Sequence, residues 1–213
     1  MPNWCHNKFS VVGSVRDINQ FEQDMKDDIV RYCGQNVPIP TFTINCASPM
    51  PEELVGTRSP RKKTTSEIAE LAKINNWTSL QLSDMMKNAL TLEEESSCNA
   101  LVAKYGVDNW YEWCCIYWGV GWDACHSEDN TPQRSPGRII YDFDTAWCPP
   151  HIAIHAFANK YKTLKFSITC SFEADLFQEE NNVIGDKDIY LDVLAKSIKE
   201  HADKKNLFDQ ELA

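Results

Sequence analysis

Three stretches of this chain alternate apolar and polar residues, as strands do when one face of their sheet is buried. In the last of them Phe166 and Ile168 alternate with Ser167 and Thr169. The three stretches are residues 3–12, 139–147 and 164–172. Residues 39–46 repeat the alternation over a shorter length. The pattern therefore predicts four strands.

Helical signals fill the segments between these strands. Ser14 precedes a stretch in which Ile18, Phe21 and Met25 recur at helical spacing, so we expect a helix with one buried stripe. Three Thr-x-x-Glu/Gln sequences follow the second strand, and each can form a capping box at a helix start. They are Thr64 with Glu67, Thr78 with Gln81, and Thr91 with Glu94. Two more helices are expected, one after the third strand and one, behind an acidic loop, over residues 188–203.

The order of these elements is strand, helix, strand, insertion, strand, helix, strand. A split β-α-β motif used twice has this order, and it predicts an α+β fold with a ferredoxin-like antiparallel sheet (βαββαβ). The helical insertion falls between the second and third strands, and a helix follows the fourth. We expect residues 1–213 to form a single ferredoxin-like domain, with residues 55–137 as the helical insertion and residues 186–213 as a C-terminal helical extension.

The charge balance argues against nucleic acid as a partner. The chain has 31 acidic and 21 basic residues, for a net charge of -10, whereas a nucleic-acid binder usually carries a basic stripe. The one dense basic run is Arg58, Arg61, Lys62 and Lys63, in a stretch that also holds Pro and Ser and is typical of a solvated loop. Acidity favours solubility or a basic partner.

The chain shows no export or membrane signal. It begins without a basic start followed by an apolar segment, and it holds no uninterrupted apolar stretch long enough to cross a bilayer. Its nine cysteines are irregularly spaced and form no CxxC pair, which indicates buried thiols rather than a disulfide framework. We therefore expect a cytoplasmic protein with no membrane partner.

Three motifs resemble one known family. They are Pro2-Asn3-Trp4-Cys5-His6-Asn7 with Gly13, then Trp110-Tyr111-Glu112-Trp113-Cys114 through Trp118-Gly119 and Trp122-Asp123, and finally Phe143-Asp144-Thr145-Ala146-Trp147-Cys148-Pro149-Pro150. Together they look like the YubB-type ferredoxin-like family of bacteriophages and conjugative plasmids, a family of unknown function. The resemblance implies the fold and a mobile-element origin, and it implies no established activity. The chain departs from the family at one turn: Glu173 is followed by Ala174 and Asp175, where the family commonly has Glu-x-Gly.

One group of residues has the composition of a zinc site. His151 and His155 are four apart on a predicted helix and could face one ion together with Cys148, while Cys125 and His126 could complete a tetrahedral set. The two histidines also lie on the polar face of an amphipathic helix, which favours a solvated surface instead. We predict no metal and no cofactor.

A pair of carboxylates lies on one face of the third predicted strand. Asp142 and Asp144 could share acid–base work, because neighbouring charges drive two pKa values apart. No nucleotide-binding, hydrolase-elbow or metalloprotease motif accompanies them. We therefore predict no catalytic residues.

Tryptophans concentrate around a predicted helix at residues 109–118 that is apolar on most sides. The set is Trp110, Trp113, Trp118, Trp122 and Trp147. Such residues most often form core that joins an insertion to a sheet. They could alternatively line a pocket in which a base stacks, with Asp123 and Asp144 as its polar groups.

These observations favour a non-enzymatic accessory protein of a phage or plasmid. In this hypothesis it binds and modulates a host protein, for example a defence component, through acidic helical surfaces. The alternative is a protein that binds or sequesters a nucleotide-like small molecule at the Trp-rich seam between insertion and sheet. A nucleic-acid binder using the basic run at residues 58–63 is the weakest hypothesis. The sequence leaves the oligomeric state open.

Overall fold

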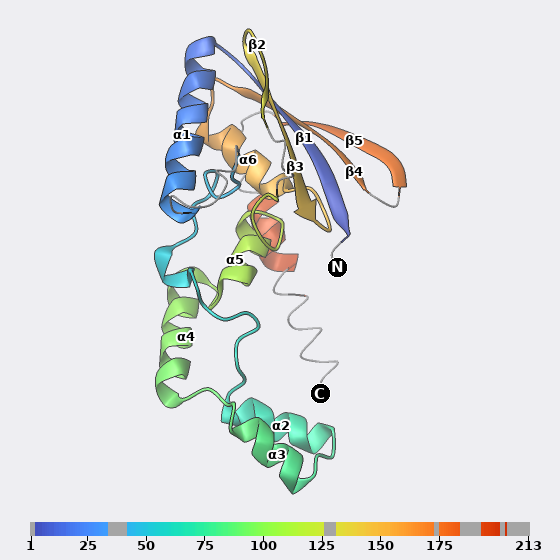
Figure 1. The fold of residues 1–213 in the computed structure, drawn as a ribbon. Helices are drawn as coiled ribbons and strands as arrows, with labels where there is room; N and C mark the ends of the chain where they lie inside the picture. Colours follow the sequence, from blue (N-terminus) through green and yellow to red (C-terminus); the bar gives the residue numbers. More distant parts are fainter. Residues whose placement is uncertain are drawn as a thin grey trace. The chain divides into compact units, whose positions relative to one another are not determined.

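A computed structural model of the chain describes residues 3–33, 42–125, 131–172, 175–183, 193–200 and 203, with side chains described outside 27–33 and 175–183. The chain divides into two compact units (Figure 1). The sheet unit comprises residues 1–49 and 114–197, and the helical unit comprises residues 50–113 and 198–213. Residues 114–137, which we expected within the insertion, therefore belong to the sheet unit.

The sheet unit contains a five-stranded sheet in the order β2-β3-β1-β4-β5, and all neighbouring strands are antiparallel. The strands are β1 (Trp4–Val12), β2 (Gln133–Ser135), β3 (Arg138–Ala146), β4 (Lys165–Phe172) and β5 (Asp175–Val183). The three strongly alternating stretches are confirmed as β1, β3 and β4, and the α+β class is confirmed. The acidic segment expected as a loop forms β5 instead, paired along the edge of β4.

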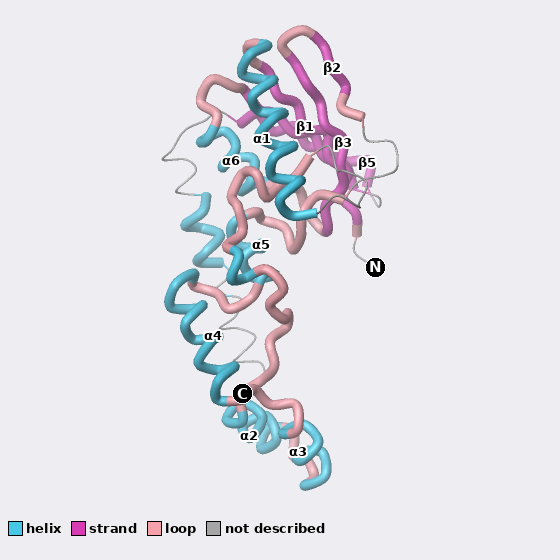
Figure 2. Tube along the Cα trace, turned by 60° about the vertical axis from the view of Figure 1, so that its left-hand side comes forward, coloured by secondary structure: helices cyan, strands magenta, loops and turns pink. Residues whose placement is uncertain are grey.

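Two helices, α1 (Val15–Cys33) and α6 (His151–Lys160), cover one face of this sheet (Figures 1 and 2). Ser14 begins α1 by accepting a hydrogen bond from the backbone N–H of Asp17 at 3.1 Å, as the sequence predicts. The core beneath the helices is aromatic. The rings of Phe9 and Phe166 stack with centroids 5.6 Å apart, and Phe21 meets Phe157 edge-on at 5.6 Å.

The predicted strand over residues 39–46 is wrong in its described part. Residues 39–41 lie outside the described residues, and residues 42–46 form a turn in which every side chain is buried. Phe42 stacks on Phe143 at 4.5 Å, so its burial comes from packing over the sheet rather than from membership in it. The strand that precedes β3 is β2, and the helical insertion therefore falls between α1 and β2.

The centre of the sheet is held by one buried amide. The side-chain nitrogen of Asn7 donates to the carbonyl oxygens of Cys5 (2.9 Å) and Phe143 (3.3 Å) and to Oγ1 of Thr145 (2.8 Å). Asn7 is 3% exposed, so its polar atoms need these partners. A residue on β1 thus fixes the adjacent end of β3.

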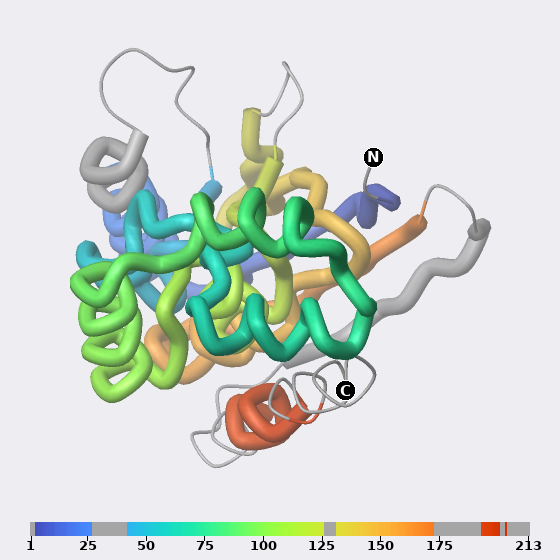
Figure 3. The backbone as a smooth tube through the Cα atoms, turned by 90° about the horizontal axis from the view of Figure 1, so that it is seen from below, coloured from blue at the N-terminus to red at the C-terminus, as the bar shows by residue number. Residues whose placement is uncertain are grey.

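The helical unit contains η1 (Glu52–Leu54), α2 (Thr65–Ile74), α3 (Ser79–Met86) and α4 (Leu92–Tyr105), followed by the start of α5 (Trp110–Tyr117). All three predicted capping boxes are confirmed, with both reciprocal hydrogen bonds present in each. Gly106 closes α4 in the left-handed conformation, with φ 79°. Figure 3 shows α2 and α3 side by side as a helical hairpin. The predicted C-terminal helix is present over its described residues 193–200.

Two cations of the basic run are used inside the helical unit. The Arg61 guanidinium donates to both carboxylate oxygens of Glu67, at 3.0 and 2.5 Å, and lies 3.2 Å from the nearly buried carboxylate of Asp108. Lys62 pairs with Glu94 at 2.7 Å. These ion pairs join the loop to α2 and α4, so half of the basic run is neutralised internally rather than displayed as a phosphate-binding patch.

The Arg61–Glu67 pair predicts an acid-sensitive helical unit. Partial burial alone would raise the pKa of Glu67, but hydrogen bonds from Arg61 and from the Thr64 backbone lower it to about 2. A carboxyl whose pKa is depressed on folding stabilises the fold above its unfolded pKa, and that contribution is lost as pH falls from about 4.5 towards 2. Because Glu67 is 39% exposed, solvent screening limits the effect to about 1 kcal/mol.

The measurement is urea unfolding followed by circular dichroism between pH 2 and 7. Glu67→Gln should lower stability at pH 7 and flatten the acid branch of the profile. Glu70→Gln, at an exposed position on the same helix, serves as the charge-matched control and should keep the wild-type profile. An unchanged acid branch in Glu67→Gln would contradict the assignment.

Candidate functional site

The seven residues of the predicted Trp-rich seam are divided between the two units. Trp110 and Trp113 lie in the helical unit, and the other five lie in the sheet unit. Trp118 is structural: it is 3% exposed, and its indole N–H donates to the carbonyl oxygen of Ser48 at 2.8 Å. Trp122 is partly exposed.

Asp123 is occupied in holding the turn at residues 42–46. Its carboxylate accepts hydrogen bonds from the Thr43 hydroxyl (2.6 Å) and from the backbone N–H groups of Ile44 (2.6 Å) and Ala124 (2.7 Å). Burial raises the pKa of Asp123, and the donated hydrogen bonds oppose that rise. Because its carboxylate already accepts these hydrogen bonds, Asp123 is better suited to anchor the structure than to bind a ligand. The same hydrogen bonds explain why residues 42–46 form a turn rather than an extended strand.

Trp147 lies just beyond β3 and is 61% exposed. Its backbone φ is 71°, a conformation that residues other than glycine rarely adopt. Its backbone N–H donates to the carbonyl oxygen of Asn3 at 2.8 Å. The five seam residues of the sheet unit thus have separate environments. The indole of Trp118 is buried, that of Trp122 is partly exposed and that of Trp147 is exposed. The Asp123 carboxylate is occupied by the hydrogen bonds it accepts, and Asp144 lies on β3. The ligand-binding hypothesis for the seam stays a prediction.

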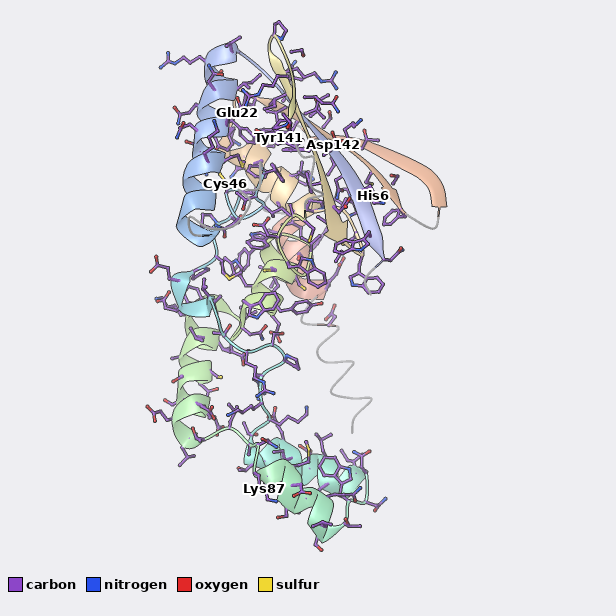
Figure 4. All side chains as sticks on the ribbon, in the orientation of Figure 1. His6, Glu22, Cys46, Lys87, Tyr141 and Asp142 are labelled. Atoms are coloured by element: carbon purple, nitrogen blue, oxygen red, sulfur yellow. The ribbon has the colours of Figure 1, made fainter. Side chains whose placement is uncertain are left out.

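Asp144 belongs instead to the sheet face opposite α1 and α6, which we call the open sheet face. It is formed by His6, Lys8, Asp142, Asp144, Thr169 and Ser171, from β1, β3 and β4. His6 Nδ1 lies 2.6 Å from Asp144 Oδ1, and Lys8 Nζ lies 3.8 Å from Asp142 Oδ1. Figure 4 shows His6 and Asp142 on the side of the sheet away from Glu22 of α1. The predicted carboxylate pair does share a face, but each carboxylate has its own basic partner on β1.

The backbone also fixes Asp144. Its N–H and carbonyl oxygen exchange hydrogen bonds with those of Cys125, at 2.9 and 2.8 Å, as an isolated β-bridge. The side chain that faces His6 is therefore presented from a strand position paired on both sides. Sequence reasoning missed His6 and Lys8 as partners, because alternation indicates only that they share the outer face of β1.

The candidate zinc ligands whose placement is described do not form a metal site. Among the residues that the structure describes, no group of three or more His, Cys, Asp or Glu side chains is placed to hold a metal ion. His126 lies outside those residues. Burial, with His151 nearby, lowers the pKa of His155, and Cys148 donates to the carbonyl oxygen of Gly119 at 3.2 Å.

The cysteines whose side chains are described form no disulfide. Burial raises the pKa of Cys5 to about 12, with Cys170 close by as a second cause. Such a thiol is protonated at neutral pH and behaves as a small core residue.

A second polar cluster joins α1 to the rest of the sheet unit. Glu22 is 8% exposed and forms an ion pair with Arg134 of β2. Tyr161 donates to Asp24 at 2.8 Å, while the Lys160 ammonium donates to the carbonyl oxygen of Cys46 at 2.8 Å. These contacts tie α1, β2, α6 and the turn at residues 42–46 together, which is a structural role.

Exposed apolar side chains concentrate in the helical unit. Of the eleven large apolar side chains that are exposed among the described residues, three lie in the sheet unit and eight in the helical unit. Leu80 at the start of α3 is 73% exposed, and Leu92 at the start of α4 is 87% exposed. Neither α3 nor α4 contains a buried residue.

The described helices are all too short or too polar to cross a bilayer.

Comparison with known proteins adds little. No family model matches the chain, and no curated protein matches it. Among solved structures, the chain is similar to protein api92 from Yersinia pseudotuberculosis, of the family DUF1281, with a TM-score of 0.40 and 10% sequence identity over 86% of this chain and 95% of that one. At this level of similarity we draw no conclusion from it.

Proposed function

We propose that this chain is an accessory protein of a phage or plasmid that binds a host protein through its helical unit. The exposure of Leu80 and Leu92 carries the proposal. A single exposed leucine is ordinary, but eight of the eleven exposed large apolar side chains among the described residues lie in the helical unit, the smaller of the two. Exposed apolar groups of this kind characterise surfaces that bind other proteins.

The charge of the helical unit indicates which kind of surface its protein partner presents. The unit holds 14 acidic and 10 basic residues, a net charge of -4. Several of its basic groups are neutralised within it: Arg61 and Lys62 form the pairs described above, and Lys104 lies 2.5 Å from Glu53. Three consecutive acids, Glu93 to Glu95, lie in the first turn of α4 beside Leu92. The partner that fits is a protein with an apolar groove and a basic rim.

The proposed origin rests on the sequence motifs, and the sheet supports only the fold proposed with it. The proposed ferredoxin-like unit is β1-α1-β2-β3-α6-β4, with β5 added at one edge. Its support is the order β2-β3-β1-β4 with antiparallel neighbours, in which β3, α6 and β4 form a split β-α-β around β1. The first and last family-like motifs supply Asn7 and Thr145, whose hydrogen bond joins β1 to β3. These two motifs therefore contain residues with a structural role in the sheet.

The test compares Leu80→Glu/Leu92→Glu with Val15→Glu. Both leucines lie in the first turn of their helices, where an added acid is compatible with the helix dipole. Val15 is 60% exposed on the sheet unit and is the matched control. Tagged protein is used to enrich partners from host lysate, and the captured protein is then purified and titrated by calorimetry.

We expect the double variant to weaken binding by about 30-fold or more, as loss of an interface anchor does, and the control to bind as the wild type does. Equal weakening by Val15→Glu, or full binding by the double variant, would exclude the helical unit as the interface. The absence of any saturable partner in the calorimetry would overturn the function itself.

A further inference from the structure

The strand register places a serine, a histidine and an aspartate in one row across the open sheet face. His6 on the central strand β1 is directly opposite Asp144 on β3 and directly opposite Ser171 on β4. Residues directly opposite in antiparallel strands share a face, with Cβ atoms about 4.5–5.5 Å apart. The imidazole therefore stands between a carboxylate and a hydroxyl contributed by three different strands.

The contact between His6 and Asp144 orients the imidazole. Nδ1 of His6 lies 2.6 Å from Asp144 Oδ1, so the carboxylate accepts the Nδ1 proton and leaves Nε2 as the basic nitrogen. With Nδ1 turned towards β3, the other side of the ring faces β4, which carries Ser171. His6 is 50% exposed and Asp144 32% exposed, so a small molecule can reach the row.

The hydroxyl is near the imidazole but is not bonded to it. Among the contacts of the described side chains, no hydrogen bond joins Ser171 to His6. Catalytic hydrogen bonds are often long or poorly aligned before substrate binds, so the missing bond does not exclude Ser171.

The neighbouring row supplies positive charge and a hydroxyl. Lys8 is opposite Thr169 on β4 and Asp142 on β3, two residues along each strand from the first row. The Lys8 side chain is 55% exposed, and its ammonium is only loosely paired with Asp142, at 3.8 Å. Lys8 and Thr169 are therefore the donors available to an oxyanion that forms at Ser171.

We propose that Ser171, His6 and Asp144 form a nucleophilic serine site that hydrolyses small, unhindered carboxylic esters. This site lies in the sheet unit, and it is independent of the partner surface proposed for the helical unit. Asp144 is a positioning residue, while His6 and Ser171 act on the substrate.

The reaction proceeds in two balanced steps. Ser171 Oγ forms a bond to the acyl carbon as its proton passes to His6 Nε2, and the ester C–O bond breaks as the alcohol leaves with that proton. Water then attacks the acyl carbon and gives a proton to His6. The acyl–oxygen bond to Ser171 breaks, the serine recovers the proton, and the carboxylic acid is released. No oxidant or reductant is required.

A structural role for the same row would be a surface ion pair, which contributes little to stability and makes no serine reactive. Labelling distinguishes the two roles. The full-length chain is incubated with a fluorophosphonate, and the modified residue is identified by peptide mass spectrometry. Hydrolysis of p-nitrophenyl acetate is followed in parallel.

The variants are Ser171→Ala, His6→Gln and Asp144→Asn, and the control is Ser167→Ala. Ser167 lies on the same strand and the same face but is opposite Ser10, with no imidazole beside it. We expect the label on Ser171, at least tenfold slower labelling and hydrolysis in Ser171→Ala and His6→Gln, and wild-type rates in Ser167→Ala.

Labelling spread equally over Ser167 and Ser171, or hydrolysis by Ser171→Ala at the wild-type rate, overturns the proposal. Mapping of the label on the wild-type chain decides the question even if one of the variants does not fold.

Discussion

Replacing Phe157 with alanine should lower the free energy of unfolding of the sheet unit by about 3–5 kcal/mol. Phe157 is fully buried on α6. Its ring centroid lies 5.6 Å from that of Phe21, 5.7 Å from Phe42, 5.9 Å from Phe9 and 6.3 Å from Phe166. These neighbours come from α1, the turn at residues 42–46, β1 and β4. Truncation therefore leaves a cavity at the point where four segments meet, and no single segment can move to fill it.

The measurement is urea unfolding monitored by circular dichroism. Phe157→Leu is the control, since it keeps most of the side-chain volume and should cost less than about 1.5 kcal/mol. A loss below about 1 kcal/mol in Phe157→Ala would mean that the core collapses around the cavity, and that α6 is packed less firmly than the ring contacts indicate.

Replacing Asp123 with alanine should cost about 3 kcal/mol and release the turn at residues 42–46. The carboxylate is the shared acceptor for the Thr43 hydroxyl and the backbone N–H groups of Ile44 and Ala124. Removing it leaves these donors without an acceptor in a part-buried site, and each unsatisfied donor costs about 1 kcal/mol or more. Phe42, which the turn presents to the core, should lose its position as well.

Hydrogen exchange of the amides at residues 42–46, followed by mass spectrometry, measures the local effect, and urea unfolding measures the global one. Asp123→Asn retains one acceptor oxygen and should lie between the wild type and Asp123→Ala. Asp142→Ala removes an exposed carboxylate from the open sheet face and should leave the exchange of the turn unchanged. Wild-type protection of Ile44 in Asp123→Ala would refute the anchoring role.

The two proposed functions, binding of a host protein and ester hydrolysis, belong to different units. The helical unit leaves apolar side chains exposed, so it is suited to bind a protein partner. The sheet unit buries its apolar side chains on one face and displays rows of charged and hydroxyl groups on the other. Loss of host-protein binding and loss of ester hydrolysis would therefore follow from different substitutions.

The sequence determined the features that depend on near neighbours. The alternation in residues 3–12, 139–147 and 164–172 predicted β1, β3 and β4, because the side-chain period of a strand is a local property. The capping boxes at Thr64, Thr78 and Thr91 predicted three helix starts, because each box closes over only three residues.

The tertiary structure decided the rest. Residues 42–46 alternate like a strand, but hydrogen bonds that they donate to Asp123, far along the chain, hold them in a turn. The edge strand β2 has no alternation to detect, since all three of its residues are exposed. Asp142 and Asp144 could be placed on one face from the sequence, whereas their partners could not.

His6 and Asp144 are 138 residues apart in the chain. Only the register between β1 and β3 brings them together, and only the register between β1 and β4 adds Ser171. Sheet register depends on which buried faces pack against one another over the whole unit, so local pattern determined the strands and the packed core determined the site.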